Sequence, residues 1–181
     1  MTVEEHRPHK GNVHCDIFDP SKTPWKKVKD AVMRVEKLAF GPEGAEKKKD
    51  MKKWFKDKRN IVVFLMSEQG GLLGYTIGFP FDNPDIPDDI KSGKAAEKSD
   101  TVYVYSTAIL GQFRGRQLIS PLMDKFENEV RSRGYECIER NAAVENGYAD
   151  SIARHYGDRV LEVRDGTSPI YGPQRFFRIR L

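Results

Sequence analysis

The chain has 181 residues and a formal net charge of +4 at pH 7, which is too mild to indicate a partner by itself. Hydrophobic residues make up 38% of it and charged residues 32%, a balance typical of a folded protein and not of a disordered one. No apolar run approaches the ~20 residues that span a membrane. The N-terminus lacks the apolar stretch of a secretory signal, so we expect no membrane association and a cytoplasmic location. Two cysteines, Cys15 and Cys137, are too few for a disulfide framework.

The N-terminal part of the chain predicts a strand and a helix. Residues 1–10 are polar, and we expect a flexible tail there. After a strand at 13–18, a helix opens at Pro24, and its apolar positions recur every three or four residues. They are Val28, Ala31, Val32, Val35, Leu38 and Ala39. The pair Gly41-Pro42 is expected to end this helix.

A second helix carries most of the excess positive charge, in residues 47–59. Met51, Trp54 and Phe55 fall at helical spacing, so we expect them to be buried and the lysines to face water. A surface for nucleic acid or for a ribosome is the alternative. No zinc-finger spacing or aromatic RNA-binding box accompanies the lysines, so a nucleic-acid partner is not expected.

The rest of the chain predicts more strands and two helices. Strands at 61–66 and 72–81 form a hairpin. The acidic, proline-containing segment at 81–100 is expected to be a functional loop. The remaining predicted elements are a strand at 101–109, a helix at 118–130 capped by Gly134, a strand at 135–144, a helix at 149–156, and strands at 160–163 and 175–181.

These elements predict one fold. A strand, a helix and a strand follow one another between 101 and 144, so those two strands should be parallel with a right-handed crossover. Hairpins connect the others. We therefore predict an α/β (mixed α+β) fold, with a mixed, mostly antiparallel sheet, one parallel strand pair and helices on both faces. No repeat and no linker divides the sequence, so we expect a single domain over residues 1–181.

The stretch that points to chemistry is the turn from Gln112 to Leu118. Gly115 stands between a strand and a helix, where a glycine lets the backbone turn tightly and approach a ligand. The first N–H groups of the helix point there, and the helix dipole favours an anion. Arg114 and Arg116 flank the turn and can add charge-assisted contacts. These residues predict a site for phosphate or pyrophosphate, and an ordinary surface turn is the alternative.

The turn resembles the cofactor motif of the GNAT superfamily of N-acetyltransferases, which is Gln/Arg-x-x-Gly-x-Gly/Ala between a strand and a long helix. Gln112, Gly115 and the preceding strand match this motif, whereas Gln117 replaces its last glycine or alanine. The order of elements, from the helix at 28–39 to the closing strands, resembles the family as well. The resemblance implies a GNAT-like acyl-CoA N-acyltransferase domain. Its two parallel strands should splay apart, which frees backbone groups for pantetheine.

The resemblance also implies which residues hold acetyl-CoA. The end of the strand should bind the acetyl and pantetheine part, and the amides that follow should bind the pyrophosphate. The implied cofactor-binding residues are Thr107, Ala108, Ile109, Gln112, Arg114, Gly115, Arg116, Gln117, Leu118 and Ser120. Pro121 departs from the usual pattern, because it removes one donor and disfavours helical geometry at Ser120. We therefore expect this helix to begin late or to bend.

The family's frequent general acid is a tyrosine on the helix after the second parallel strand, and Tyr156 matches it in order and spacing. A hydroxyl donor suits protonation of the leaving thiolate, and a core aromatic beside Ile152 is the alternative. The family's usual asparagine seven residues earlier is Ala149 here, so that cofactor contact is not expected. The general base is unassigned. Glu139 is the nearest candidate by order, although an exposed strand residue is the expected reading of this glutamate, and Tyr105 could line the acceptor side.

We therefore expect an acetyl-CoA-dependent N-acetyltransferase that transfers acetyl to a primary amine by direct attack on the thioester, as a monomer or homodimer. A backbone N–H near Ile109 would polarise the thioester carbonyl. The carboxylates of the loop at 81–100 suggest a cationic acceptor. The alternative is a non-catalytic acyl-CoA-binding sensor or scaffold. No metal is expected, because the histidines near the N-terminus match no standard site spacing.

Overall fold

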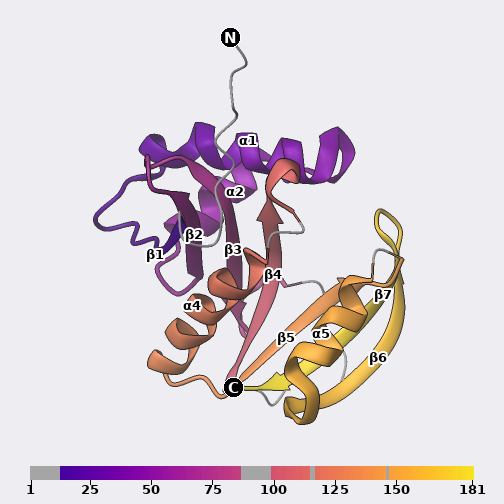
Figure 1. Ribbon diagram of the computed structural model, residues 1–181. Helices are drawn as coiled ribbons and strands as arrows, with labels where there is room; N and C mark the ends of the chain where they lie inside the picture. The colour runs from indigo at the N-terminus through magenta and orange to yellow at the C-terminus, as the bar shows by residue number, and fades with distance from the viewer. Residues whose placement is uncertain (1–12, 87–98, 115–116, 146) are drawn as a thin grey trace. The chain divides into compact units, whose positions relative to one another are not determined.

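The computed structural model describes residues 13–86, 99–114, 117–145 and 147–181 (Figure 1). Its elements follow the predicted order of strand, two helices, three strands, helix, strand, helix and two strands, with two short 3-10 turns added. They are β1 (Val13–Ile17), α1 (Trp25–Gly44), α2 (Lys48–Lys56), β2 (Ile61–Ser67), β3 (Leu72–Pro80), β4 (Thr101–Ile109), η3 (Gly111–Phe113), α4 (Ile119–Ser132), β5 (Cys137–Ala143), α5 (Tyr148–Tyr156), η4 (Gly157–Arg159), β6 (Val160–Ser168) and β7 (Gly172–Arg180).

The strands form one seven-stranded sheet in the order β1-β2-β3-β4-β5-β7-β6. β4 and β5 are parallel, whereas β1–β2, β5–β7 and β6–β7 are antiparallel. The predicted mixed, mostly antiparallel sheet with one parallel pair is therefore confirmed. Nearly every residue of β2 and β3 is buried, so both faces of the sheet are covered at these strands.

The chain divides into two compact units, which are described separately. The first unit contains Met1–Lys58, Val62–Thr76 and Thr107–Phe126. The second unit contains Arg59–Ile61, Ile77–Ser106 and Glu127–Leu181. The tail expected at 1–10 lies outside the described residues.

In the first unit, α2 buries its apolar residues as predicted. Met51, Trp54 and Phe55 are buried, and the lysines of this helix are exposed. The ring of Phe55 lies 5.0 Å from that of Trp25 and 5.4 Å from that of Phe18, measured between centroids. Aromatic rings at these separations add to the stability that burial itself supplies. The basic segment is therefore an amphipathic helix with a solvated lysine face.

The apolar face of α1 differs from the predicted one. Its buried residues are Trp25, Val32, Val35 and Glu36, whereas Leu38 is 57% exposed. The helix breaks where the sequence predicted an end, because Gly41 has φ +73° and ψ 179° and Pro42 follows it. A second short helical segment then continues to Gly44. The buried carboxyl of Glu36 accepts hydrogen bonds from the Tyr75 hydroxyl and the Glu46 N–H.

In the second unit, α5 packs against β5 and β7 (Figure 1). β5 is shorter than predicted. β6 and β7 are longer than predicted, because each polar residue of β6 through Ser168 pairs with a residue of β7.

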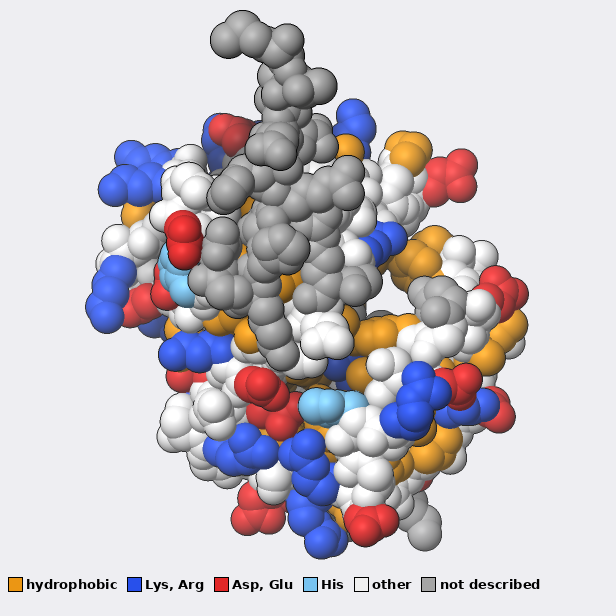
Figure 2. Space-filling model, viewed as in Figure 1, with side chains coloured by type: hydrophobic (Ala, Val, Ile, Leu, Met, Phe, Trp, Pro, Cys, Tyr) orange, Lys and Arg blue, Asp and Glu red, His pale blue; other side chains and the backbone are white. Residues whose placement is uncertain are grey.

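Lys, Arg, Asp and Glu side chains are interspersed over the face of the molecule in view (Figure 2). In the described part of the chain, no helix has the length and apolar character needed to cross a membrane.

Candidate functional site

The end of β4 in the first unit is held closely by β3. The Leu110 N–H donates to the Leu73 carbonyl at 2.9 Å, and the Thr107 and Thr76 hydroxyls lie 3.0 Å apart. Of the three residues implied to bind the acyl group, Thr107 is half-buried, whereas Ala108 and Ile109 are buried.

Gly74 explains how closely the two strands approach. A Cβ at this position would lie 2.5 Å from the Ala108 carbonyl oxygen and 3.0 Å from Ile109 Cγ1. Any side chain would therefore displace the end of β4. This glycine was not singled out in the sequence, because a glycine within a strand gives no sign of what it touches.

The turn after β4 begins with η3, in which Gln112 is exposed and Phe113 is buried. The guanidinium of Arg114 then donates from Nε to the Ile109 carbonyl at 3.2 Å and from Nη2 to the Ala39 carbonyl at 2.8 Å. Arg114 therefore ties the turn to β4 and to α1. The structure gives this side chain a positioning contact in addition to the phosphate contact that the sequence implied.

The turn then enters α4. Gly115 and Arg116, which carry the centre of the predicted motif, lie outside the described residues. Among the described residues, Gln117 is the one non-glycine residue with positive φ, at 58°. A left-handed backbone costs a non-glycine residue roughly 1–2 kcal/mol, which gives a physical reason for glycine at this position of the motif.

The helix α4 starts at Ile119, after the buried Leu118, and contains Ser120 and Pro121 in its first turn. A proline there is tolerated, because the N–H groups of the first turn have no intrahelical partner. The predicted late start agrees with a helix that begins at Ile119, two residues after Gln117. The N-terminus of the helix still follows the turn directly, as an anion site requires.

The parallel pairing of β4 with β5 covers part of the two strands. The β4–β5 register runs from Thr101 opposite Cys137 to Val104 opposite Arg140. Both strands continue beyond this register, β4 as far as Ile109 and β5 as far as Ala143. β5 keeps its pairing with β7 throughout. The pairing of β4 with β5 therefore ends at Val104, before the end of either strand.

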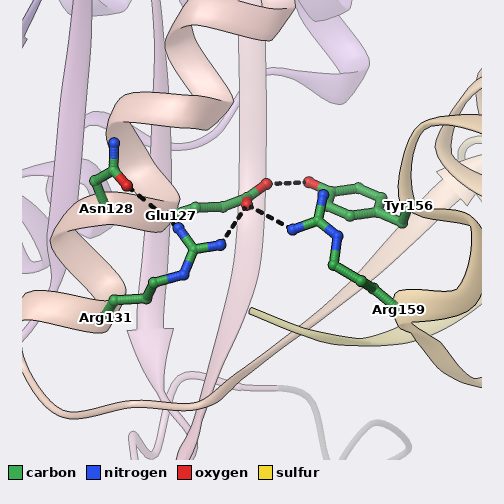
Figure 3. Close-up of polar contacts among 5 residues, drawn as sticks. All are labelled: Glu127, Asn128, Arg131, Tyr156 and Arg159. Atoms are coloured by element: carbon green, nitrogen blue, oxygen red, sulfur yellow. Dashed lines mark hydrogen bonds and ion pairs between the residues drawn. The ribbon is translucent and has the colours of Figure 1, made fainter.

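Tyr156 lies in the second unit, within a charged cluster that Figure 3 shows. Its hydroxyl donates to Glu127 Oε1 at 2.6 Å, and both side chains are buried. The other carboxylate oxygen of Glu127 contacts Arg131 at 3.4 Å and Arg159 at 3.5 Å. Arg159 also stacks over the Tyr156 ring, 4.9 Å from its centroid. The ring of His155 lies edge-on to that of Tyr156, at 4.7 Å.

This cluster controls the ionisation of Tyr156. Burial first, and then the charge of Glu127, raise the pKa of Tyr156 above its ordinary value. The hydroxyl is therefore protonated throughout the neutral range, which a proton donor requires. Sequence reasoning identified Tyr156 but missed Glu127 and Arg159. A glutamate on an amphipathic helix reads as a surface residue, and only its contacts show otherwise.

Glu139 differs from the prediction, because it is fully buried and not exposed. The burial raises the pKa of Glu139 to about 7, and the charge of Glu162 adds to the shift. Arg178, opposite it on β7, approaches Glu139 Oε1 to 3.5 Å. The alternation of β5 turns Glu139 to one face and Arg140 to the other. A carboxyl of this pKa has the proton affinity of a general base near neutral pH.

Metal and thiol chemistry find little support in the described residues. No group of three or more His, Cys, Asp or Glu in this part of the chain is arranged to hold a metal ion. Burial raises the pKa of both Cys15 and Cys137 to about 11, so neither thiol ionises near neutral pH.

In the predicted acidic loop, Asp82 forms an ion pair with Arg59 at 3.5 Å, whereas residues 87–98 lie outside the described residues.

Known proteins share this sequence pattern and this fold. The sequence model of the Acetyltransferase (GNAT) family matches residues 28–156, more than half of the chain. No curated protein matches the chain. Among solved structures, aminoglycoside 6'-acetyltransferase type Ii is 16% identical, with a TM-score of 0.66 and coverage of 92% of this chain and 96% of that one.

Two further structures have the same fold. The yncA protein of Salmonella typhimurium, solved with its cofactor acetyl-CoA, is 14% identical, with a TM-score of 0.63 and coverage of 94% of both chains. The ribosomal-protein-S18-alanine N-acetyltransferase of Escherichia coli is 12% identical, with a TM-score of 0.63 and coverage of 93% of both chains. At these identities the likeness shows the fold alone.

Proposed function

This chain belongs to the GNAT acetyltransferase family, and from that premise we propose that it transfers the acetyl group of acetyl-CoA to a primary amine. The observation that carries the proposal is the connection from β4 through the turn into α4, which lies within the family match. A helix N-terminus directly after a glycine-containing turn favours a pyrophosphate. The end of the β4–β5 pairing at Val104 supports a place for pantetheine on the unpaired backbone of β4.

In the proposed reaction, the neutral amine attacks the thioester carbonyl carbon directly. The C–N bond forms, the C–S bond breaks, and the thiolate leaves with a proton. A backbone N–H near Ile109 stabilises the developing oxyanion, as fixed donors do in acyl transfer. Tyr156 supplies the proton to sulfur, and the amine nitrogen releases its own proton to a base. Glu139 is a candidate for that base on its pKa alone, so we assign it no role.

We propose a cationic amine as the acceptor, from the carboxylates in the loop at 81–100. The names of the solved relatives include an aminoglycoside and an alanine of a ribosomal protein, so the fold is compatible with chemically different amines. Replacing Asp85, Asp88 and Asp89 by asparagine should weaken the binding of a cationic acceptor. Unchanged acceptor affinity in that variant would contradict this part of the proposal.

The first test is calorimetric titration with acetyl-CoA. Wild-type protein should bind it, and Gly115→Asp should abolish binding, because a carboxylate would face the pyrophosphate. Gln69→Asp is the matched control, since it adds the same charge at an exposed turn of the first unit. Absence of binding by the wild-type protein would overturn the proposal. If Gly115→Asp still binds acetyl-CoA, the pyrophosphate does not bind at this turn.

A non-catalytic acyl-CoA sensor is the second candidate, and Ala149 favours it. This position, at which the family usually has an asparagine, is a fully buried alanine of α5. It therefore offers no polar side chain to the cofactor. The measurement that separates the two functions is release of free CoA in the presence of a panel of amines. Tight acetyl-CoA binding without acceptor-dependent release would favour the sensor.

A further inference from the structure

The hydrogen bond between Glu127 and Tyr156 is buried and short, unlike an ion pair on the surface. The two side chains are 4% and 3% exposed, and their oxygens lie 2.6 Å apart. A donor so close to a buried carboxylate makes a charge-assisted bond, which is about twice as strong as a neutral one. The bond joins the C-terminal half of α4 to the end of α5 (Figure 3).

The bond has a consequence for the chemistry of Tyr156. A phenol has one proton, and here that proton points to Glu127. While the bond lasts, the hydroxyl cannot donate to a sulfur atom. Proton donation therefore requires Tyr156 to leave Glu127, and it creates a phenolate next to a carboxylate. Like charges this close repel each other, so a compensating cation is needed.

Arg159 is the cation placed to compensate. It lies 3.5 Å from Glu127 Oε2 and stacks over the Tyr156 ring at 4.9 Å. Arg131 lies at nearly the same distance from Oε2, 3.4 Å, but its second contact is with Asn128. The two arginines thus share one partner and differ at the other. Figure 3 shows them on opposite sides of the Glu127 carboxylate.

We propose that Glu127 is a positioning residue that holds the Tyr156 hydroxyl and its proton until the hydroxyl turns to the leaving group, and that Arg159 balances the charge left on the phenol oxygen. In this step the O–H bond of Tyr156 breaks and an S–H bond forms on the leaving group. The phenolate then recovers a proton from water, and the hydroxide that this leaves is neutralised by the proton that the amine nitrogen released. This inference rests on the proposed function of Tyr156 as proton donor.

The electrostatic surroundings of Tyr156 are shared among several elements. Glu127 raises its pKa, and Arg140 on β5 lowers it. The charged and titratable groups that act on the hydroxyl or lie against its ring are Glu127 on α4, Arg140 on β5, Tyr148 and His155 on α5, and Arg159 on η4. Arg131, also on α4, contacts Glu127. Removing the Glu127 charge should therefore make Tyr156 more acidic, with Arg140 and Arg159 still present.

The test measures ionisation of Tyr156 by ultraviolet absorbance of tyrosinate in the full-length protein, without substrate. Subtracting the Tyr156→Phe titration isolates the contribution of this residue. Glu127→Gln keeps an acceptor oxygen and the side-chain size, and Tyr156 should then ionise at a lower pH than in the wild type. An identical titration in the wild type and in Glu127→Gln would overturn the proposal.

Activity measurements separate the two arginines. Arg159→Gln should lower kcat about tenfold and leave the KM for acetyl-CoA unchanged, because a stacked cation is lost where charge develops. Arg131→Gln, the matched control, should keep kcat close to the wild-type value. Equal effects of the two substitutions would overturn the role of Arg159. This pair leaves Glu127 in place, so it remains informative if Glu127→Gln does not fold.

The same experiments separate this inference from the proposed function. If Tyr156→Phe retains full kcat, Tyr156 is not the proton donor, and that part of the proposed function fails. The absorbance titration does not depend on activity, so it still reports whether Glu127 governs the Tyr156 proton. If acetyl-CoA does not bind at all, the failure belongs to the proposed function and not to the Glu127–Tyr156 pair.

Discussion

Substituting Glu139 by glutamine should stabilise the protein at alkaline pH and have little effect at acidic pH. The carboxyl of Glu139 is fully buried, and this burial raises its pKa from 4.5 to about 7. The folded state therefore holds a proton on this group more tightly than the unfolded state does. The contribution of this proton to stability is fully present below about pH 4.5 and is lost as the pH rises through about 7.

The shift in the pKa of Glu139 determines how much the substitution changes the free energy of unfolding. A change from 4.5 to about 7 corresponds to about 3 kcal/mol when the group is fully ionised. This shift is a net one, because it already includes the Arg164 charge, which favours the ionised form of Glu139. We therefore expect Glu139→Gln to be more stable than the wild type by about 3 kcal/mol at about pH 8, and by much less at about pH 5.

Urea unfolding at a series of pH values measures this difference. The free energy of unfolding of Glu139→Gln minus that of the wild type should rise between about pH 5 and about pH 8. Glu68→Gln, at an exposed turn, is the matched control and should give a flat difference. A difference for Glu139→Gln that does not change with pH would refute the reasoning, because it would mean that the buried carboxyl is not held in its protonated form.

Two further predictions concern the turn and the strand before it. Gln117→Gly should leave stability in urea unfolding unchanged or raise it by about 1 kcal/mol, because glycine adopts a left-handed backbone without strain. Gln117→Val should lower stability. Equal stability of the two variants would contradict the presence of backbone strain at this position. Gly74→Ala should cost about 1–3 kcal/mol and weaken acetyl-CoA binding in calorimetry, because its Cβ would lie 2.5 Å from the Ala108 carbonyl oxygen. Gly111→Ala, whose Cβ would meet nothing within 4 Å, should do neither, and equal losses from both alanines would rule out the close approach.

Local patterns in the sequence were sufficient for the order of the elements. The helical spacing of Met51, Trp54 and Phe55 identified the buried side of α2, because that spacing follows from the helix alone. The polar second half of β6 was missed, since pairing with β7 and not its own residues makes it a strand. The buried Glu36 has a detectable signal. It lies four residues after Val32, on the same helical face.

The residues of the candidate site divide in the same way, between those whose environment is local and those whose partners are distant. The turn between β4 and α4 is local, so the sequence predicts an anion site there without any tertiary contact. Arg114 shows where this reasoning ends. Beside a phosphate turn an arginine reads as a phosphate ligand, yet two of its donors bind the carbonyls of Ile109 and Ala39. The Ala39 carbonyl is accessible because α1 breaks at Gly41, and this break lies far from Arg114 in the sequence. Tyr156 shows the same limit, since its partner Glu127 lies on another helix. A motif therefore predicts where an anion or a proton donor is placed, whereas the contacts that decide what each side chain can donate become known only from the fold.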